Sequence, residues 1–199
     1  MDGLTSTAFV GPIGIAALWL TFFGQLDQSY DLYLAKYEGN LPRIVIACTS
    51  VYFIIDSYKL IKECNHRKNI GYYMHHIVGI FSLLLYYLTG SPQKIIINYL
   101  VYELSTPLLN LMLYHRKNNT LNTMYGIFFQ IIFILTFFTV RVIYGTFLSY
   151  EAIQISKNNY PQLMILPIGL QTLNYFWFWK IMHLGFRSLV LKNLEKKTE

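Results

Sequence analysis

Charged residues and cysteine are scarce in this sequence. Of its 199 residues, only 16 are Lys or Arg and 10 are Asp or Glu, whereas 54% are hydrophobic. A soluble domain of this length cannot bury so many apolar side chains in one core, so most of the surface must face something other than water. The scarcity of charge therefore excludes most soluble classes of protein.

The few Cys and His residues exclude several kinds of site. Cys48 and Cys64 fall on one predicted helix, where about 24 Å would separate them, so they cannot form a disulfide with each other. No Cys and His residues have the spacing of a zinc site, and 5 scattered histidines are too few for a membrane di-iron enzyme. We expect no metal site.

Long apolar runs occupy most of the chain instead. Five of them are long enough to cross about 30 Å of hydrocarbon as helices, and one shorter run precedes them. They lack the period-two alternation of barrel strands. The sequence therefore predicts an all-α polytopic membrane protein of about six transmembrane helices. The predicted spans are 8–23, 44–61, 72–90, 95–114, 124–148 and 163–184.

The net charge of +6 is spread over loops and the C-terminal tail. Because it forms no basic face, we expect no nucleic acid partner. Basic residues are more frequent on the side of the two termini, which predicts that both termini lie in the cytosol or the matrix. That side holds Lys62, Arg67, Lys68, Arg116, Lys117, Arg187, Lys192, Lys196 and Lys197, and the other holds Lys36, Arg43, Lys94 and Lys157.

Ionisable side chains inside the spans need a structural or functional reason, because each costs on the order of 2.5–3.5 kcal/mol there. In span 95–114, Glu103, Thr106, Pro107 and Asn110 follow the spacing of one helical face. Pro107 has no N–H for the carbonyl of Glu103, so we expect a kink there. The other ionisable residues are Asp56, His75, His76, Arg141, Lys180 and His183, and the neutral polar residues include Asn98, Ser105, Gln130, Gln171 and Asn174.

This pattern predicts one ion pair and limits what the two histidines can do. Arg141 is the strong intramembrane donor that suits Glu103, although its depth also allows it to reach the interface. His75 and His76 point about 100° apart on a helix, so both rings cannot easily bind one metal ion. A hydrogen bond to a neighbouring helix is the ordinary role of such a histidine.

These motifs, in order and one per span, resemble the TLC domain family of multispan proteins of endomembranes and related organelles. The resemblance covers about 37–191, which divides the chain into an N-terminal segment (1–36), a TLC-type transmembrane domain and a polar basic tail (192–199). It rests on residues 52–56, 74–79, 103–110, Arg141 and 173–180. It implies a helical bundle with a cavity whose polar lining includes Asp56, His75, His76, Glu103, Thr106, Asn110, Arg141, Asn174 and Lys180.

The resemblance implies two different kinds of activity, because members of the family differ in function. Ceramide synthases use paired histidines to transfer an acyl group from acyl-CoA to a sphingoid base, which would make His75 and His76 catalytic. Other members are linked to lipid trafficking, membrane composition or fluidity. Span 95–114 has no His-Asp or paired Asp and instead resembles the non-synthase branch. We therefore favour a role other than enzyme.

Three functional hypotheses follow. The favoured one is a membrane protein that binds or organises lipid as an accessory subunit of a larger complex, for example a mitochondrial respiratory-chain or ATP synthase assembly. The alternatives are an N-acyltransferase of the ceramide synthase type and a stand-alone regulator of membrane lipid composition or trafficking. We expect a bound phospholipid or other lipid, no further cofactor, other membrane subunits as partners, and an endomembrane or mitochondrial inner membrane location. We also predict that Glu103, Asn110 and His76 line one cavity.

Overall fold

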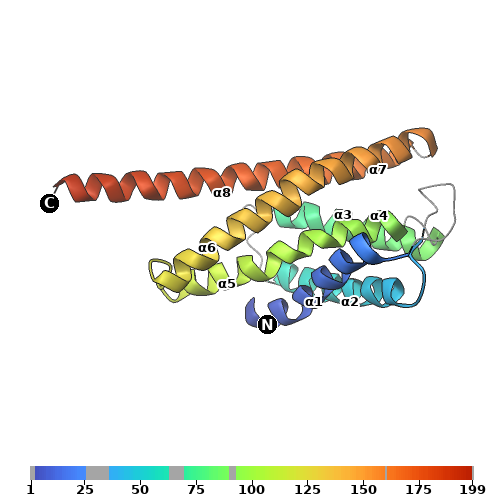
Figure 1. Ribbon diagram of the computed structural model, residues 1–199, viewed down its shortest axis with the longest axis horizontal. Coiled ribbons are helices and arrows are strands. Elements are labelled where there is room, and N and C mark those ends of the chain that lie inside the picture. Colours follow the sequence, from blue (N-terminus) through green and yellow to red (C-terminus); the bar gives the residue numbers. More distant parts are fainter. Residues whose placement is uncertain (1–2, 26–35, 63–69, 90–92, 160, 199) are drawn as a thin grey trace.

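The described part of the protein is a bundle of helices. The computed structural model describes residues 3–25, 36–62, 70–89, 93–159 and 161–198, and no strand occurs among them. The helices run alongside one another, and the C-terminal end of the last one extends past the rest of the bundle (Figure 1). The all-α prediction is confirmed.

Regular helices and three short irregular ones alternate along the chain. In order, the elements are α1 (Gly3–Phe23), α2 (Leu41–Lys62), α3 (Ile70–Thr89), α4 (Gln93–Leu100), η1 (Val101–Leu104), α5 (Ser105–Lys117), α6 (Met124–Phe137), η2 (Phe138–Tyr144), α7 (Gly145–Asn159), η3 (Pro161–Met164) and α8 (Ile165–Thr198). Two of the irregular helices, η1 and η2, fall inside predicted spans.

Three helical segments of the described chain are long and apolar enough to cross a membrane. They are Leu41–Lys59, Gln93–Lys117 and Met124–Lys157, and Val10–Phe23 is a shorter apolar helix. This finding agrees with an integral membrane protein, while the count of six spans stays a prediction. Cys64, Arg67, Lys68 and the side chains from 186 onward lie outside the described residues, so the predicted orientation of the termini also stays a prediction.

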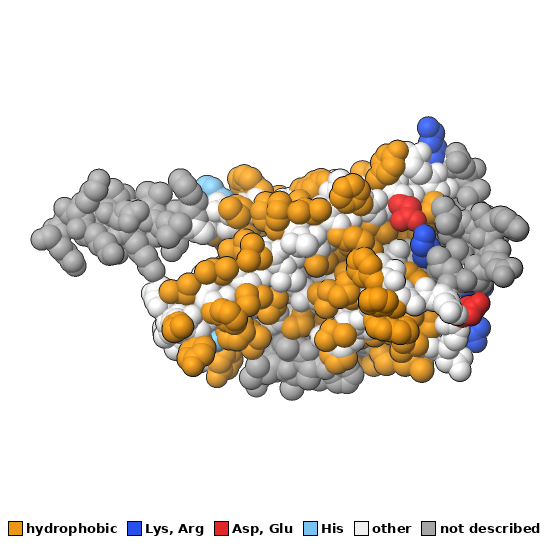
Figure 2. Space-filling model, viewed as in Figure 1, with side chains coloured by type: hydrophobic (Ala, Val, Ile, Leu, Met, Phe, Trp, Pro, Cys, Tyr) orange, Lys and Arg blue, Asp and Glu red, His pale blue; other side chains and the backbone are white. Residues whose placement is uncertain are grey.

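The surface of the bundle is apolar along its sides. Large hydrophobic side chains such as Phe22, Ile54, Phe147 and Ile165 are more than 60% exposed. In Figure 2 hydrophobic side chains cover much of the visible face, and the Lys, Arg, Asp and Glu side chains that are seen on this face gather at one end. Such a surface suits a hydrocarbon environment with water at its end.

The first helix packs deep in the bundle. α1 contacts α2, α4, η1 and α5, and its Val10 and Ala17 are fully buried. Gly14 permits this packing, because a Cβ there would lie 2.9 Å from the backbone nitrogen of Leu104. The short, glycine-containing first span is therefore adapted to close contact with η1.

Two of the irregular helices interrupt two of the membrane-length segments, Gln93–Lys117 and Met124–Lys157. η1 is a 3₁₀-helix that ends three residues before Pro107, in the turn where the missing N–H predicts a break. η2 is a π-helix that contains Arg141 and joins α6 to α7. π-turns shift the phase of the side chains that follow and are often found at functional sites. In this protein the two irregular helices carry Glu103 and Arg141.

Candidate functional site

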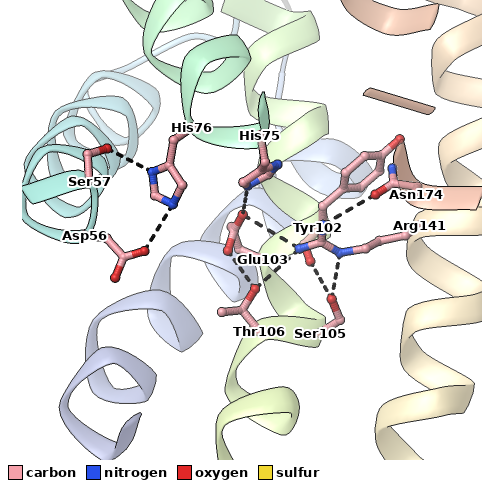
Figure 3. A network of polar contacts seen from close by, with 10 residues as sticks. All are labelled: Asp56, Ser57, His75, His76, Tyr102, Glu103, Ser105, Thr106, Arg141 and Asn174. Carbon is pink, nitrogen blue, oxygen red and sulfur yellow. Dashed lines mark hydrogen bonds and ion pairs between the residues drawn. The ribbon is translucent and has the colours of Figure 1, made fainter. Parts of the chain in front are cut away.

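Glu103 lies at the centre of a buried polar network (Figure 3). Its Oε1 is 3.9 Å from Nη2 of Arg141 and 3.8 Å from Nε2 of His75. Its Oε2 accepts a hydrogen bond of 2.8 Å from the hydroxyl of Thr106. The side chains of Glu103 and Arg141 are only 7% and 6% exposed. The pair expected from the sequence is thus present, and His75 joins it.

Polar groups from two other segments hold the guanidinium of Arg141. Its Nε donates to Oγ of Ser105 at 2.8 Å, Nη2 donates to Oγ1 of Thr106 at 3.4 Å, and Nη1 donates to Oδ1 of Asn174 at 3.5 Å. Because a buried cation is costly without such partners, they keep the guanidinium inside the bundle instead of at the interface. The rings of Tyr102, Phe137 and Trp177 surround it at 5.6, 5.4 and 5.9 Å.

The backbone of the π-helix also takes part. Gln171 on α8 donates from Nε2 to the carbonyl of Arg141 at 3.1 Å, and its Oε1 accepts from the hydroxyl of Tyr102 at 3.3 Å. Gly145 leaves room for this contact, because a Cβ there would lie 2.5 Å from the Tyr102 hydroxyl. These bonds connect η1, η2 and α8 at one level of the bundle.

His76 belongs to a separate polar cluster between α2 and α3. Its Nε2 is 3.2 Å from Oδ2 of Asp56, and its Nδ1 is 3.0 Å from the hydroxyl of Ser57. The ring of Phe53 packs against both histidines, with its centre 5.7 Å from that of His75 and 5.2 Å from that of His76, and the two imidazole centres are 5.8 Å apart. The adjacent histidines therefore serve different partners, as their 100° separation predicts.

The Asp56, His76 and Ser57 cluster has the residue types of a hydrolase triad. Asp56 and Ser57 are neighbours within α2, whose interior backbone N–H groups are used by the helix itself. An oxyanion needs such donors free and aimed at it. We therefore assign this cluster the role of joining α2 to α3.

A cavity opens beside the Glu103 network. The cavity and the open space at its mouth together amount to about 900 Å³. Its wall is formed by α2, α3, α4, η1, α7, η3 and α8. His75 and Glu103 lie together on this wall, and most of the remainder is apolar. The apolar lining includes Phe53, Val78, Leu83, Ile96, Leu100, Ala152, Leu166 and Leu170.

One nitrogen at this cavity lacks a partner. In the described part of the chain, Nδ1 of His75 and Nδ2 of Asn110 are the buried side-chain nitrogens or oxygens without a hydrogen bond. An unpaired buried polar atom costs about 1–3 kcal/mol. His75 lines the cavity and its Nε2 is directed at Glu103, so a molecule bound in the cavity is a candidate partner for Nδ1.

Seven of the nine predicted lining residues fall into three groups. His75 and Glu103 line the cavity; Thr106, Arg141 and Asn174 reach it through the Glu103 network; Asp56 and His76 form the separate cluster. Asn110 and Lys180 are not among the described lining residues, and Lys180 is exposed on α8.

We expected Glu103, Asn110 and His76 to line one cavity, but the described lining includes Glu103 without the other two. His75 takes the position expected for His76, because the rotation of α3 turns His76 toward α2. Asn110 lies seven residues beyond Glu103, about 10 Å along the helix axis, and the 3₁₀ turn at η1 alters the helical phase between them.

Sequence reasoning left several network residues out of the predicted site. The network also includes Ser57, Tyr102, Ser105 and Gln171, each of which contacts a predicted site residue. The i, i+3 spacing of Gln171 and Asn174 on one helical face was a usable signal for Gln171. The part played by Tyr102 depends on tertiary packing and had no such signal.

Comparison with known proteins agrees with the motifs. The TLC domain family matches residues 3–183 of the chain. A TLC domain-containing protein of Acanthamoeba polyphaga mimivirus is 33% identical over 192 residues, which are 92% of each chain.

A second relative is an uncharacterized TLC domain-containing protein of Schizosaccharomyces pombe. It is 32% identical over 152 residues, which are 69% of this chain and 49% of the yeast protein. The family match includes α1 as well as the five motif-bearing segments. With its helical bundle, its apolar surface and this match over most of its length, the chain belongs to the TLC domain family.

Proposed function

We propose that this TLC domain protein binds a membrane lipid in the cavity beside His75 and Glu103. The wall is apolar over most of its area and polar where these two residues meet, which matches a molecule with a hydrocarbon chain and a small polar head. The apolar flanks of the bundle would place such a cavity within the bilayer, where lipid is the most abundant ligand.

The observation that carries the proposal is the unpaired Nδ1 of His75. The other polar groups of the network contact one another, whereas this atom belongs to a side chain of the cavity wall and is buried without a partner. A bound head group would supply the missing hydrogen bond and remove the cost of leaving the atom desolvated.

Lipid retained by the purified protein tests this proposal. The protein would be purified from membranes in mild detergent, and its bound lipids would be extracted and measured by mass spectrometry. Ser82→Phe should reduce the retained lipid at least several-fold, because Ser82 lines the cavity and its hydroxyl bonds only to the carbonyl of Val78 in its own helix. The added phenyl ring would occupy space that the hydrocarbon chain of the lipid would otherwise fill.

Thr172→Phe is the matched control. Thr172 also bonds to its own helix, through the carbonyl of Ile168, but it is exposed on α8. This variant should retain lipid as the parent protein does. Equal retention in both variants, with the same lipids, would mean that the lipid covers only the outer surface and that the cavity proposal is wrong.

The finer roles derived from the sequence stay predictions. An accessory subunit of a membrane complex could use the same exposed apolar flanks to contact other subunits. Identification of proteins that co-migrate with the chain after extraction in mild detergent tests that role and its mitochondrial location. A stable stoichiometric partner would support it, and migration of the chain alone would count against it.

A further inference from the structure

We infer that the lipid recognised at this cavity has an uncharged head that donates a hydrogen bond, such as a hydroxyl or an amide N–H. This inference rests on the proposed lipid-binding function and narrows it to one chemical class. It follows from the charges at the polar end of the cavity, the hydrogen bonds already made there, and the orientation of His75.

The charges at the polar end already balance. The carboxylate of Glu103 faces the guanidinium of Arg141 at 3.9 Å. None of the described lining residues is Lys or Arg, so no further cation is there to bind a phosphate or carboxylate. An anionic head would also meet the Glu103 carboxylate. An ammonium head would meet the Arg141 guanidinium beside the same carboxylate oxygen, and it would lose its hydration.

Hydroxyl groups on the wall are largely engaged within the protein. Tyr102 donates to Gln171, Thr49 donates to the carbonyl of Val45, and Ser82 donates to that of Val78. These three hydroxyls have already donated their protons within the protein, so they offer no free donor to a head that only accepts hydrogen bonds. Among the described lining residues, Nδ1 of His75 is the buried nitrogen without a partner.

Glu103 determines what kind of head this nitrogen can bind. The carboxylate lies 3.8 Å from Nε2 of His75 and favours the tautomer that carries its proton there. In that neutral tautomer Nδ1 has a lone pair and accepts hydrogen bonds. A lipid hydroxyl or amide N–H can donate to it, whereas an ether oxygen cannot.

Competition between four lipids with the same oleyl chain tests this inference. The protein in phosphatidylcholine nanodiscs would be crosslinked by a long-chain alcohol that carries a photoreactive diazirine. The competitors would be oleyl alcohol, its methyl ether, oleyl phosphate and oleylamine, compared at equal concentrations in the bilayer. The alcohol should compete about three- to tenfold better than the ether, which corresponds to one net hydrogen bond. The phosphate and the amine should compete more weakly than the alcohol.

Two variants connect the preference to the named residues. His75→Phe should keep crosslinking but remove the advantage of the alcohol over the ether, and His183→Phe, at an exposed histidine of α8, should leave it unchanged. If His75→Phe does not fold, Glu103→Gln serves in its place, since an amide no longer imposes one tautomer and the discrimination should shrink.

The outcomes separate this inference from the proposed function. If the ether, the phosphate or the amine reduces crosslinking of the cavity residues as strongly as the alcohol does, the inference is wrong and the lipid-binding proposal stands. Crosslinks confined to the outer surface of the bundle would overturn both. Both are supported if crosslinks form in the cavity, the alcohol is the best competitor, and His75→Phe removes the preference for the alcohol over the ether.

Discussion

His75 and His76 are neighbours in the chain, yet their Nε2 atoms face different acids. Nε2 of His75 lies 3.8 Å from Glu103, and Nε2 of His76 lies 3.2 Å from Asp56. One histidine therefore belongs to the cavity and its ion pair, and the other joins α3 to α2. Replacing the two should have different consequences for lipid binding and for stability.

Arg141→Ala should destabilise the protein more than Glu103→Gln. Removing the guanidinium leaves the carboxylate buried without its cation and breaks the bonds to Ser105 and Asn174, a loss of about 3–5 kcal/mol. A glutamine at position 103 can still accept from Thr106, so about 1–3 kcal/mol is expected. Thermal unfolding in detergent measures both, with the exposed Arg116→Ala as control. Small and equal losses would mean that the pair contributes little.

Gly145→Ala should disturb the contact between η1 and α8. The added Cβ would lie 2.5 Å from the Tyr102 hydroxyl and 2.8 Å from Oε1 of Gln171, and overpacking of this kind costs about 1–3 kcal/mol. Gly169→Ala on α8 is the control, because its Cβ would meet nothing within 4 Å. Alanine favours the helix there, so a gain of about 0.5–1 kcal/mol is expected. Similar unfolding temperatures for the two variants would refute the close approach at Gly145.

Asp56 and His76 should be energetically coupled. A double-mutant cycle with Asp56→Ala and His76→Ala, measured by unfolding in detergent, should give a coupling energy of about 0.5–2 kcal/mol, since the two side chains are in direct contact. The cycle of Asp56→Ala with His75→Ala should be nearly additive, because His75 faces Glu103 instead. Coupling of the same size in both cycles would show that the histidines act as one unit.

The protein should have no acyl-CoA-dependent N-acyltransferase activity. Both ring nitrogens of His76 are engaged by Asp56 and Ser57, and Nε2 of His75 faces Glu103. The reaction also requires groups that position the amine and stabilise charge on the thioester carbonyl. Purified protein with long-chain acyl-CoA and a sphingoid base should give product no faster than the His75→Ala, His76→Ala double variant. A histidine-dependent rate would establish the enzyme instead.

Hydrophobic patterning predicts the helices well but not their ends. The run 44–61 lies within α2, and the run 124–148 lies within the continuous helical segment that ends at Asn159. A hydropathy signal stops where polar side chains begin, whereas the backbone hydrogen bonds of a helix continue into water. The same limit applies to α8, which extends to Thr198, well beyond the predicted 163–184.

The site could be predicted in kind but not in detail. The pairing of Glu103 with Arg141 could be predicted because an isolated charge in a bilayer is costly. Only a few intramembrane residues of this chain carry an opposite charge that can offset that cost. Which of two adjacent histidines faces that pair depends on the rotation of α3 about its axis, and the sequence does not specify it. The π-helix around Arg141 has no proline or glycine within Phe138–Tyr144 to reveal it.

A structure of the protein determined in lipid nanodiscs tests the central claim most directly. We predict density for one lipid in the cavity between α2, α3, α4, α7 and α8, with its polar head within hydrogen-bonding distance of Nδ1 of His75. A cavity filled by repacked side chains or by water alone, with lipid density only on the outer surface of the helices, would contradict the account.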